Sequence, residues 1–346
     1  MPPAPPPSLS PPEVDWLLDP SPFTAGVYRG AHPHEIALHN GLVSRTWRLQ
    51  PNGATVGYRN CMTSESVLRS VRPEATVDLD GCHYAIGGLV GLEEHAYLRP
   101  EWIDALTSDP AAFQLRDWRT GPTEPPFAWK RVRHAPDLPW PPPGVRLTLT
   151  YQPPAGRLVG LEATTCCELY DGIPLLCKWL SVHNGTGQRL RLDGFAAEVL
   201  AVVEFDSLVE SRDSLHLPAI HVESDYGLFS IDPRHDRQTT QWLPDPLYTT
   251  QVNYTYQTRC LLESRPPRGP AVWLEPGETF TSFRTFELVF DSTDRERQGL
   301  AVRRMYRTVA PWTQENPILM HVRHAEPEAV RAAINQCAAV GFEMVI

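Results

Sequence analysis

The sequence contains no apolar run long enough to cross a membrane. A membrane-spanning helix needs about 20 consecutive apolar residues, and no stretch of this chain reaches that length. The N-terminal stretch MPPAPPPSLSPPEVDW has neither the basic segment nor the apolar segment of a secretory signal. These absences predict a cytoplasmic location. Proline-rich segments are extended and pack poorly, so residues 1–12 are predicted to be a disordered tail.

The sequence has fewer basic than acidic residues. The chain has 31 Lys and Arg against 41 Asp and Glu, which gives a net charge of −10, and no basic stripe interrupts this balance. Nucleic-acid binding depends on neutralising phosphates, and binding to anionic lipid depends on clustered Lys and Arg. The composition therefore predicts neither a nucleic-acid partner nor a membrane partner.

Motifs for common cofactors, metals and nucleophiles are also missing. The seven cysteines include no CxxC pair, and an odd count without a secretory signal predicts reduced thiols. The chain has no G-x-S-x-G, P-loop, HExxH or GxGxxG motif. We therefore predict no cofactor and no metal site.

Proline and glycine, by contrast, are frequent. The 36 prolines and 22 glycines divide most of the chain into short segments, which excludes long helices there. Segments such as GVRLTLTY alternate apolar and polar residues, and turn pairs such as Asp80-Gly81 and Asp171-Gly172 separate them. Many short strands joined by such turns predict a mainly β fold, an antiparallel sandwich over residues 13–290.

The pattern changes after residue 290. Apolar residues recur at helical spacing at Val302, Met305, Tyr306 and Val309. This spacing predicts an amphipathic helix over residues 291–312, which Pro311 ends.

A strand, a helix and a second strand are predicted over residues 313–346. PILMHV and FEMVI have the composition of buried strands. Pro327 suits the first turn of the helix between them, and Gly341 suits the position after its end. Strands joined by a helix are parallel, so this segment is predicted to be a βαβ unit.

Three stretches resemble glycoside hydrolase family 36, the α-galactosidase-like enzymes. YDGIPLLCKWLSVHN, which begins at Tyr170, resembles a Tyr-Asp-Gly-(apolar)-Pro segment followed by Lys-Trp in the N-terminal domain of that family. LEPGETFTSFRTFELVF resembles the strand pair that closes the domain. DRERQGLAVRRMYRTVAP followed by ENPILMH resembles the helix that leads into the catalytic barrel and the first strand of that barrel. The resemblance covers residues 160–346.

This resemblance implies a fold and a function. The fold is a β-supersandwich, a linker helix and the first βαβ unit of an incomplete (β/α)8 barrel, which ends after its second strand. In the family, an aspartate nucleophile and an aspartate acid/base lie on the fourth and sixth barrel strands. Hydrolysis of an α-glycosidic bond needs both carboxylates, so the chain is expected to be inactive alone, and it has no assigned catalytic residue.

Three candidate binding residues follow the first predicted barrel strand. They are His321, Arg323 and His324, at the strand end where (β/α)8 barrels place their active sites. The family has a Trp-containing segment here, so the sequence departs from its pattern at this point. Ordinary loop polarity is the alternative explanation for these residues.

Three further candidates are tryptophans in the Pro- and Trp-rich stretch 118–140. Aromatic faces stack on the apolar faces of sugars, so Trp118, Trp129 and Trp140 are candidates for carbohydrate binding. The alternative is a rigid loop packed on its own domain.

Two other functions stay open. The Trp-rich stretch also fits a non-catalytic carbohydrate-binding or assembly module. A mutarotase-like sugar epimerase would use a similar supersandwich, but it needs a histidine and a glutamate converging in a cleft. Carbohydrate is the predicted ligand in each case. The exposed edge of an unfinished barrel predicts pairing through residues 317–346, either with a second polypeptide that completes the barrel or with another copy of the chain.

Overall fold

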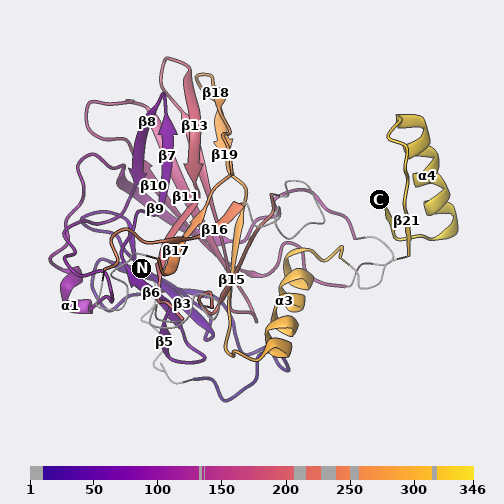
Figure 1. Cartoon of the computed structure of the whole chain (residues 1–346), viewed down its shortest axis with the longest axis horizontal. Coiled ribbons are helices and arrows are strands. Elements are labelled where there is room, and N and C mark those ends of the chain that lie inside the picture. The colour runs from indigo at the N-terminus through magenta and orange to yellow at the C-terminus, as the bar shows by residue number, and fades with distance from the viewer. Residues whose placement is uncertain are drawn as a thin grey trace. The chain divides into compact units, whose positions relative to one another are not determined.

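A computed structural model describes residues 11–131, 135, 137–205, 216–226, 239–249, 257–313 and 318–346 (Figure 1). Residues 1–10 of the predicted disordered tail lie outside this part of the chain. The chain divides into two compact units. The sandwich unit comprises Met1–Thr123 and Pro143–Val302, and the second unit comprises Glu124–Pro142 and Arg303–Ile346.

The sandwich unit is built from antiparallel sheets, which confirms the predicted mainly β class. One five-stranded sheet keeps the order of the sequence, from β1 to β5. Its strands are β1 (Gly26–Arg29), β2 (Glu35–His39), β3 (Val43–Arg48), β4 (Ala54–Asn60) and β5 (Glu65–Ser66). A short helix, α1 (Pro100–Ile103), lies between β8 and β9 in the sequence.

The largest sheet has seven strands in the order β15-β20-β12-β11-β10-β9, with β19 also paired to β12. These strands are β9 (Gln114–Pro122), β10 (Gly144–Gln152), β11 (Leu161–Tyr170), β12 (Leu175–Asn184), β15 (Ile220–Ser224), β19 (Thr279–Thr281) and β20 (Thr285–Val289). The turn between β11 and β12 lies at Asp171-Gly172, as predicted, and Gly172 has a φ of 70° there. This left-handed conformation favours glycine.

Two four-stranded sheets complete the unit, with the orders β18-β13-β7-β8 and β16-β17-β14-β6. The first contains β7 (Ala75–Leu79), β8 (Cys82–Ile86), β13 (Leu190–Ala196) and β18 (Val272–Leu274), which lie side by side in Figure 1. The second contains β6 (Leu68–Ser70), β14 (Glu198–Val202), β16 (Thr240–Pro244) and β17 (Arg259–Ser264). The predicted turn at Asp80-Gly81 joins β7 to β8.

One long apolar stretch forms two strands. The sequence from Leu190 to Val202 reads as continuous, but β13 ends at Ala196 and β14 begins at Glu198. The backbone N–H of Ala197, between them, donates to the carbonyl of Ser264. The chain therefore passes from one sheet to another without a loop, and the continuous apolar sequence concealed this change.

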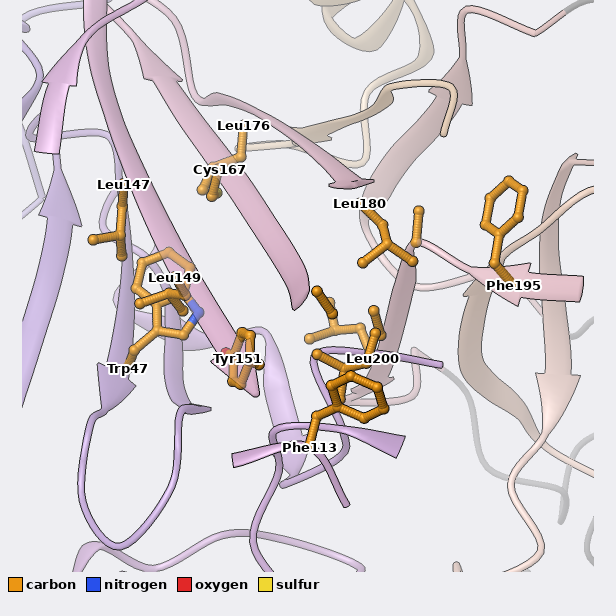
Figure 2. Packing of buried hydrophobic residues seen from close by; sticks show 14 of the residues in the cluster. Trp47, Phe113, Leu147, Leu149, Tyr151, Cys167, Leu176, Leu180, Phe195 and Leu200 are labelled. Carbon is orange, nitrogen blue, oxygen red and sulfur yellow. The ribbon is translucent and has the colours of Figure 1, made fainter. Parts of the chain in front are cut away.

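A large apolar cluster forms the main part of the core of the sandwich unit. Figure 2 shows Trp47, Phe113, Tyr151, Phe195 and other members, most of which come from strands. Trp47, Phe113 and Tyr151 are at most 1% exposed. Side chains of this size contribute most of the apolar area that folding removes from water.

Two longer helices follow the sandwich strands. Helix α3 (Arg295–Val309) is shorter at both ends than the predicted 291–312. It begins after Asp294, whose carboxylate accepts a hydrogen bond from the N–H of Arg297 as an N-cap does. Helix α4 (Pro327–Val340) begins and ends as predicted, with Pro327 in its first turn and Gly341 in the left-handed conformation after its end.

The predicted βαβ unit is confirmed as a local structure in the second unit. Strand β21 (Leu319–Met320) pairs in parallel with β22 (Met344–Val345), and α4 connects them. Only Ala333 and Cys337 of α4 are buried, and the apolar side chain of Ile334 is 50% exposed. A barrel is not formed by the described residues.

Candidate functional site

Four aromatic side chains form a cluster in the second unit. Phe127, Trp129 and Trp140 come from the loop between β9 and β10, and Trp312 follows α3. Trp140 lies at the centre, with ring-centroid distances of 5.5 Å to Phe127, 5.9 Å to Trp129 and 5.2 Å to Trp312. Trp312 also contacts Phe127 and Trp129, at 5.2 and 6.0 Å. We call these four residues the aromatic cluster.

The rings of the aromatic cluster face solvent in part. Phe127 is 49% exposed and Trp312 is 40% exposed, and Trp129 and Trp140 are half-buried. Trp140 donates from its indole nitrogen to the carbonyl of Phe127, at 3.4 Å. The rings therefore hold one another in place while leaving apolar surface uncovered, which is a feature of binding surfaces.

An ion pair helps to fix the loop that carries three of these rings. The guanidinium of Arg131 pairs with Asp137 at 2.9 Å and donates to the carbonyl of Ala135 at 3.2 Å. The rest of the basic stretch that ends at His134 lies outside the described residues.

The structure brings together two of the three predicted tryptophans. Trp129 and Trp140 belong to the aromatic cluster. Trp118 belongs to the sandwich unit, where it lies on β9 opposite Leu149 and packs against the apolar core. Phe127 and Trp312, the other two members of the aromatic cluster, were not predicted from the sequence. The signal for Trp312 was its position directly after Pro311, where α3 has ended and the chain turns.

His321, Arg323 and His324 follow β21, and all three are exposed. The N–H of Val322 donates to the carbonyl of Ile346 at 2.7 Å, so the residues lie at the carboxyl edge of the parallel β21–β22 pair. His324 lies 3.7 Å from the exposed carboxylate of Glu326. Their place at a strand end is as the sequence predicted, and their role in binding stays a prediction.

A second group of polar side chains is fully buried in the sandwich unit. We call it the ionic core, and it consists of Arg45, Glu74, Lys178, Glu198 and Glu287. Arg45 donates to both carboxylate oxygens of Glu198, at 2.7 and 3.2 Å, and Lys178 donates to Glu198 at 2.9 Å.

The remaining two carboxylates complete the ionic core. Lys178 donates to the Glu74 carboxylate at 3.0 Å, and the indole nitrogen of Trp47 donates to it at 3.0 Å. The two oxygens of Glu287 lie 3.4 Å from Arg45, farther than those of Glu198. Buried charges are tolerated when they are paired and hydrogen-bonded in this way.

Three carboxylates share two cations, and their pKa values separate accordingly. Burial and the neighbouring charge of Glu198 raise the pKa of Glu287 to about 8. Burial also acts to raise the pKa of Glu198, but the charges of Arg45 and Lys178 outweigh it and hold that pKa well below its usual value. Glu287 therefore holds the proton of the group. With every member at most 1% exposed, the ionic core has no access for substrate, and its role is structural.

The stretch that resembles the α-galactosidase-like family has structural contacts as well. The Asp171 carboxylate accepts from the N–H of Ala25 at 2.7 Å, and the N–H of Gly172 donates to the carbonyl of Phe23 at 2.7 Å. Lys178 belongs to the ionic core. The motif thus fixes the N-terminal segment and one charged member of the core.

The sandwich unit also has an open cavity of about 750 Å³. Residues at the ends of β4, β5, β14 and β20 and at the start of β15 line it, together with the segment before α3. Its described lining includes Glu65, Glu204 and Asp291 but no histidine. The described part of the lining therefore does not supply the histidine that a mutarotase-like site needs. Glu204 follows the end of β14, and the neighbouring carboxylate residue Asp206 lies outside the described residues.

The described residues contain neither a membrane-spanning helix nor a metal-binding cluster. None of the helices in this part of the chain is long and apolar enough to span a membrane. No group of three or more His, Cys, Asp or Glu side chains in the same part could hold a metal ion.

Comparisons with known proteins give distant similarities of fold. No protein-family model and no curated protein sequence matches the chain. Among solved structures, the galactosidase domain of the α-galactosidase–sucrose kinase AgaSK is 10% identical with a TM-score of 0.48, and the match covers 92% of this chain and 50% of that one. A variant of the GH36 α-galactosidase AgaA from Geobacillus stearothermophilus, in complex with raffinose, is 14% identical with a TM-score of 0.45, covering 90% and 49%.

Galactose 1-epimerase from Lactobacillus acidophilus NCFM is 11% identical with a TM-score of 0.34, and that match covers 77% of this chain and 98% of the epimerase. The chain spans about half the length of the two galactosidase chains. At these identities and TM-scores, the similarities assign neither a family nor an activity to the chain.

Proposed function

We propose that the chain is a module related to glycoside hydrolases, and that it binds carbohydrate through the aromatic cluster. The observation that carries this proposal is the convergence of Phe127, Trp129, Trp140 and Trp312 into one partly exposed surface. Sugars present apolar C–H faces, and flat aromatic rings that are already held in place can stack on them with little loss of conformational entropy.

The proposed role is binding rather than bond cleavage by the aromatic cluster. Aromatic rings stack on a sugar, but Trp and Phe side chains do not transfer protons, and glycoside hydrolysis needs a pair of carboxyl groups. Hydrolysis of an α-glycosidic bond would then take place in a larger assembly. This chain would provide the β-sandwich of that assembly and a surface that binds carbohydrate.

The proposal also includes a specific relationship to the α-galactosidase-like enzymes, which residues 170–179 support. The matching residues hold the fold: Asp171 and Gly172 bind the N-terminal segment, and Lys178 pairs with buried carboxylates. Residues with such roles would be retained in a sandwich module whether or not it is catalytic.

Domain boundaries at 13–290, 291–312 and 313–346 belong to the same proposal. The β21–α4–β22 segment is proposed as the first βαβ unit of a (β/α)8 barrel, with His321, Arg323 and His324 at its mouth. What supports this is the parallel strand pair and the exposed apolar side chains beside it, such as Ile334 at 50%. Such a pair is stable only when further strands cover it.

Carbohydrate binding is tested by titration. The chain is titrated with raffinose, maltotriose and cellotriose, and binding is followed by calorimetry and by tryptophan fluorescence. We expect at least one saccharide to bind and Trp140→Ala to weaken it by about tenfold or more, as loss of a central aromatic anchor does.

The matched control is Trp273→Ala. Trp273 is 49% exposed on β18 of the sandwich unit, so this change removes an exposed indole outside the aromatic cluster. It should leave the affinity unchanged. Equal losses in the two variants, or no binding of any of the three saccharides, would contradict the proposal.

A further inference from the structure

The cavity of the sandwich unit has a lining of one charge sign. Its walls are largely apolar, with Val67, Val203 and Phe205 among them, and its charged lining residues are Glu65, Glu204 and Asp291. No described Lys or Arg lines it. A volume of about 750 Å³ lies within the usual range of ligand pockets, roughly 300–1,000 Å³.

Asp291 is already paired with a cation, which it shares with Asp15. Arg297 donates to both oxygens of its carboxylate, at 2.9 and 2.7 Å, and the indole nitrogen of Trp16 donates to it at 2.9 Å. Glu65 and Glu204 differ, because no described Lys, Arg or His lies within 4.0 Å of either carboxylate. Among the described residues, the cavity therefore has two carboxylates with which no cation is paired.

A hydrogen bond holds the side chain of Glu204 in place. Its carboxylate accepts a hydrogen bond from the hydroxyl of Tyr248, and Tyr248 is only 2% exposed. The guanidinium of Arg69 lies 4.3 Å from the centre of the Tyr248 ring and donates to Asp245 at 2.6 Å. Arg69 is thus paired with Asp245, and the tyrosine hydroxyl holds the Glu204 carboxylate without neutralising it.

Two phenylalanines line the same cavity as the carboxylates. Phe205 is 46% exposed, and Phe290 lines the same cavity. The carbonyl of Phe290 accepts from the side chain of Asn60 at 2.9 Å, which ties two lining segments together. Carboxylates next to aromatic faces attract ammonium groups by charge and by cation–π interaction.

We infer that this cavity binds an organic cation, an ammonium group carried on an apolar body, with Glu204 as the main anion and Glu65 as a second one at the rim. Charge complementarity selects this class. The lining offers acceptors and negative charge, so a ligand carboxylate is repelled and a neutral ligand gains only packing and weak hydrogen bonds. The inference is independent of carbohydrate binding at the aromatic cluster.

Three matched probes test the inference on the full chain. They are 4-phenylbutylamine, 4-phenylbutan-1-ol and 4-phenylbutanoate, which share a body and differ in charge. Calorimetry is expected to give the amine at least about tenfold tighter binding than the alcohol, and no measurable binding of the carboxylate. Equal affinity for amine and alcohol, tighter binding of the carboxylate, or no binding of the amine would overturn the inference.

Variants locate the site. Glu204→Gln keeps an acceptor for Tyr248 but removes the charge, and it should weaken the amine to the affinity of the alcohol. Glu93→Gln removes an exposed carboxylate elsewhere and should change nothing. Phe205→Leu should weaken the amine and the alcohol alike. An unchanged amine affinity in Glu204→Gln would show that the amine binds at another place.

Amine binding at the cavity can be tested independently of saccharide binding at the aromatic cluster. Trp140→Ala, which should weaken saccharide binding, should leave amine binding unchanged, because the cavity lining contains no member of the aromatic cluster. Raffinose competing with the amine for the cavity would instead make the cavity a carbohydrate site and would overturn the assignment to a cation.

Discussion

In the sandwich unit, Arg45, Lys178 and three glutamates are at most 1% exposed, whereas in the second unit Ile318, Ile334 and Ile346 are 58%, 50% and 61% exposed. The sandwich unit buries these charged side chains, and the second unit exposes these apolar side chains. Enclosed charges are costly unless every partner is in place, so they make the fold specific. Uncovered apolar side chains contribute little to the fold and are available to a partner. The comparison separates residues that hold the structure from residues that are proposed to bind.

The largest effect is expected from Lys178→Met. It removes the cation that pairs with both Glu74 and Glu198 and leaves buried negative charge uncompensated. Breaking a buried pair in this way costs about 3–5 kcal/mol. Urea unfolding measures the free energy of unfolding, and Lys130→Met, at an exposed position of the second unit, is the control, with an expected change within about 0.5 kcal/mol. A loss below about 1 kcal/mol in Lys178→Met would remove the distinction between the units.

The second prediction concerns pH. The pKa of Glu287 is raised to about 8 in the folded chain, above its value in an unfolded one, so the folded state holds a proton that the unfolded state releases. The stability that this proton gives is complete below about pH 4.5 and is lost as the pH rises through about 8. Glu287→Gln cannot ionise, so it should remove this decline.

The measurement is the free energy of unfolding of both proteins from pH 5.5 to 8.5. Relative to Glu287→Gln, the unmodified chain should lose a few kcal/mol, on the order of 1.4 kcal/mol for each pH unit between the two pKa values. Glu74 and Glu198 act with the opposite sign, because their lowered pKa values give stability that is lost as the pH falls. Parallel curves for the two proteins would show that Glu287 is ionised in the folded state throughout.

The smallest effect on stability is expected in the second unit. Ile334 is half exposed on α4, and the sequence predicts pairing through residues 317–346. We expect the chain to self-associate with increasing concentration in sedimentation experiments, and Ile334→Lys to shift it toward monomer. Its free energy of unfolding should change by no more than about 0.5 kcal/mol.

Asn335→Lys is the matched control, since it adds the same charge at the neighbouring exposed position. Monomer formation in both variants would mean that charge, and not the apolar face, governs association.

Local features were predictable from the sequence, and long-range ones were not. Asp80-Gly81 and Gly341 mark a hairpin and a helix end because the required backbone conformations are properties of one or two residues. The ionic core joins residues as far apart as Arg45 and Glu287, which are 242 positions apart in the sequence. No local sequence pattern therefore predicts the ionic core. Trp312 likewise reaches Trp140 only in the folded chain.

The central claim is that the second unit binds carbohydrate while the sandwich unit provides the stable fold. The most direct test is fluorine NMR of the chain with its ten tryptophans labelled as 5-fluorotryptophan and assigned by single Trp→Phe replacements. When a binding saccharide is added, the signals of Trp129, Trp140 and Trp312 should shift, and those of Trp47 and Trp118 should not. Shifts confined to the sandwich tryptophans would contradict the account.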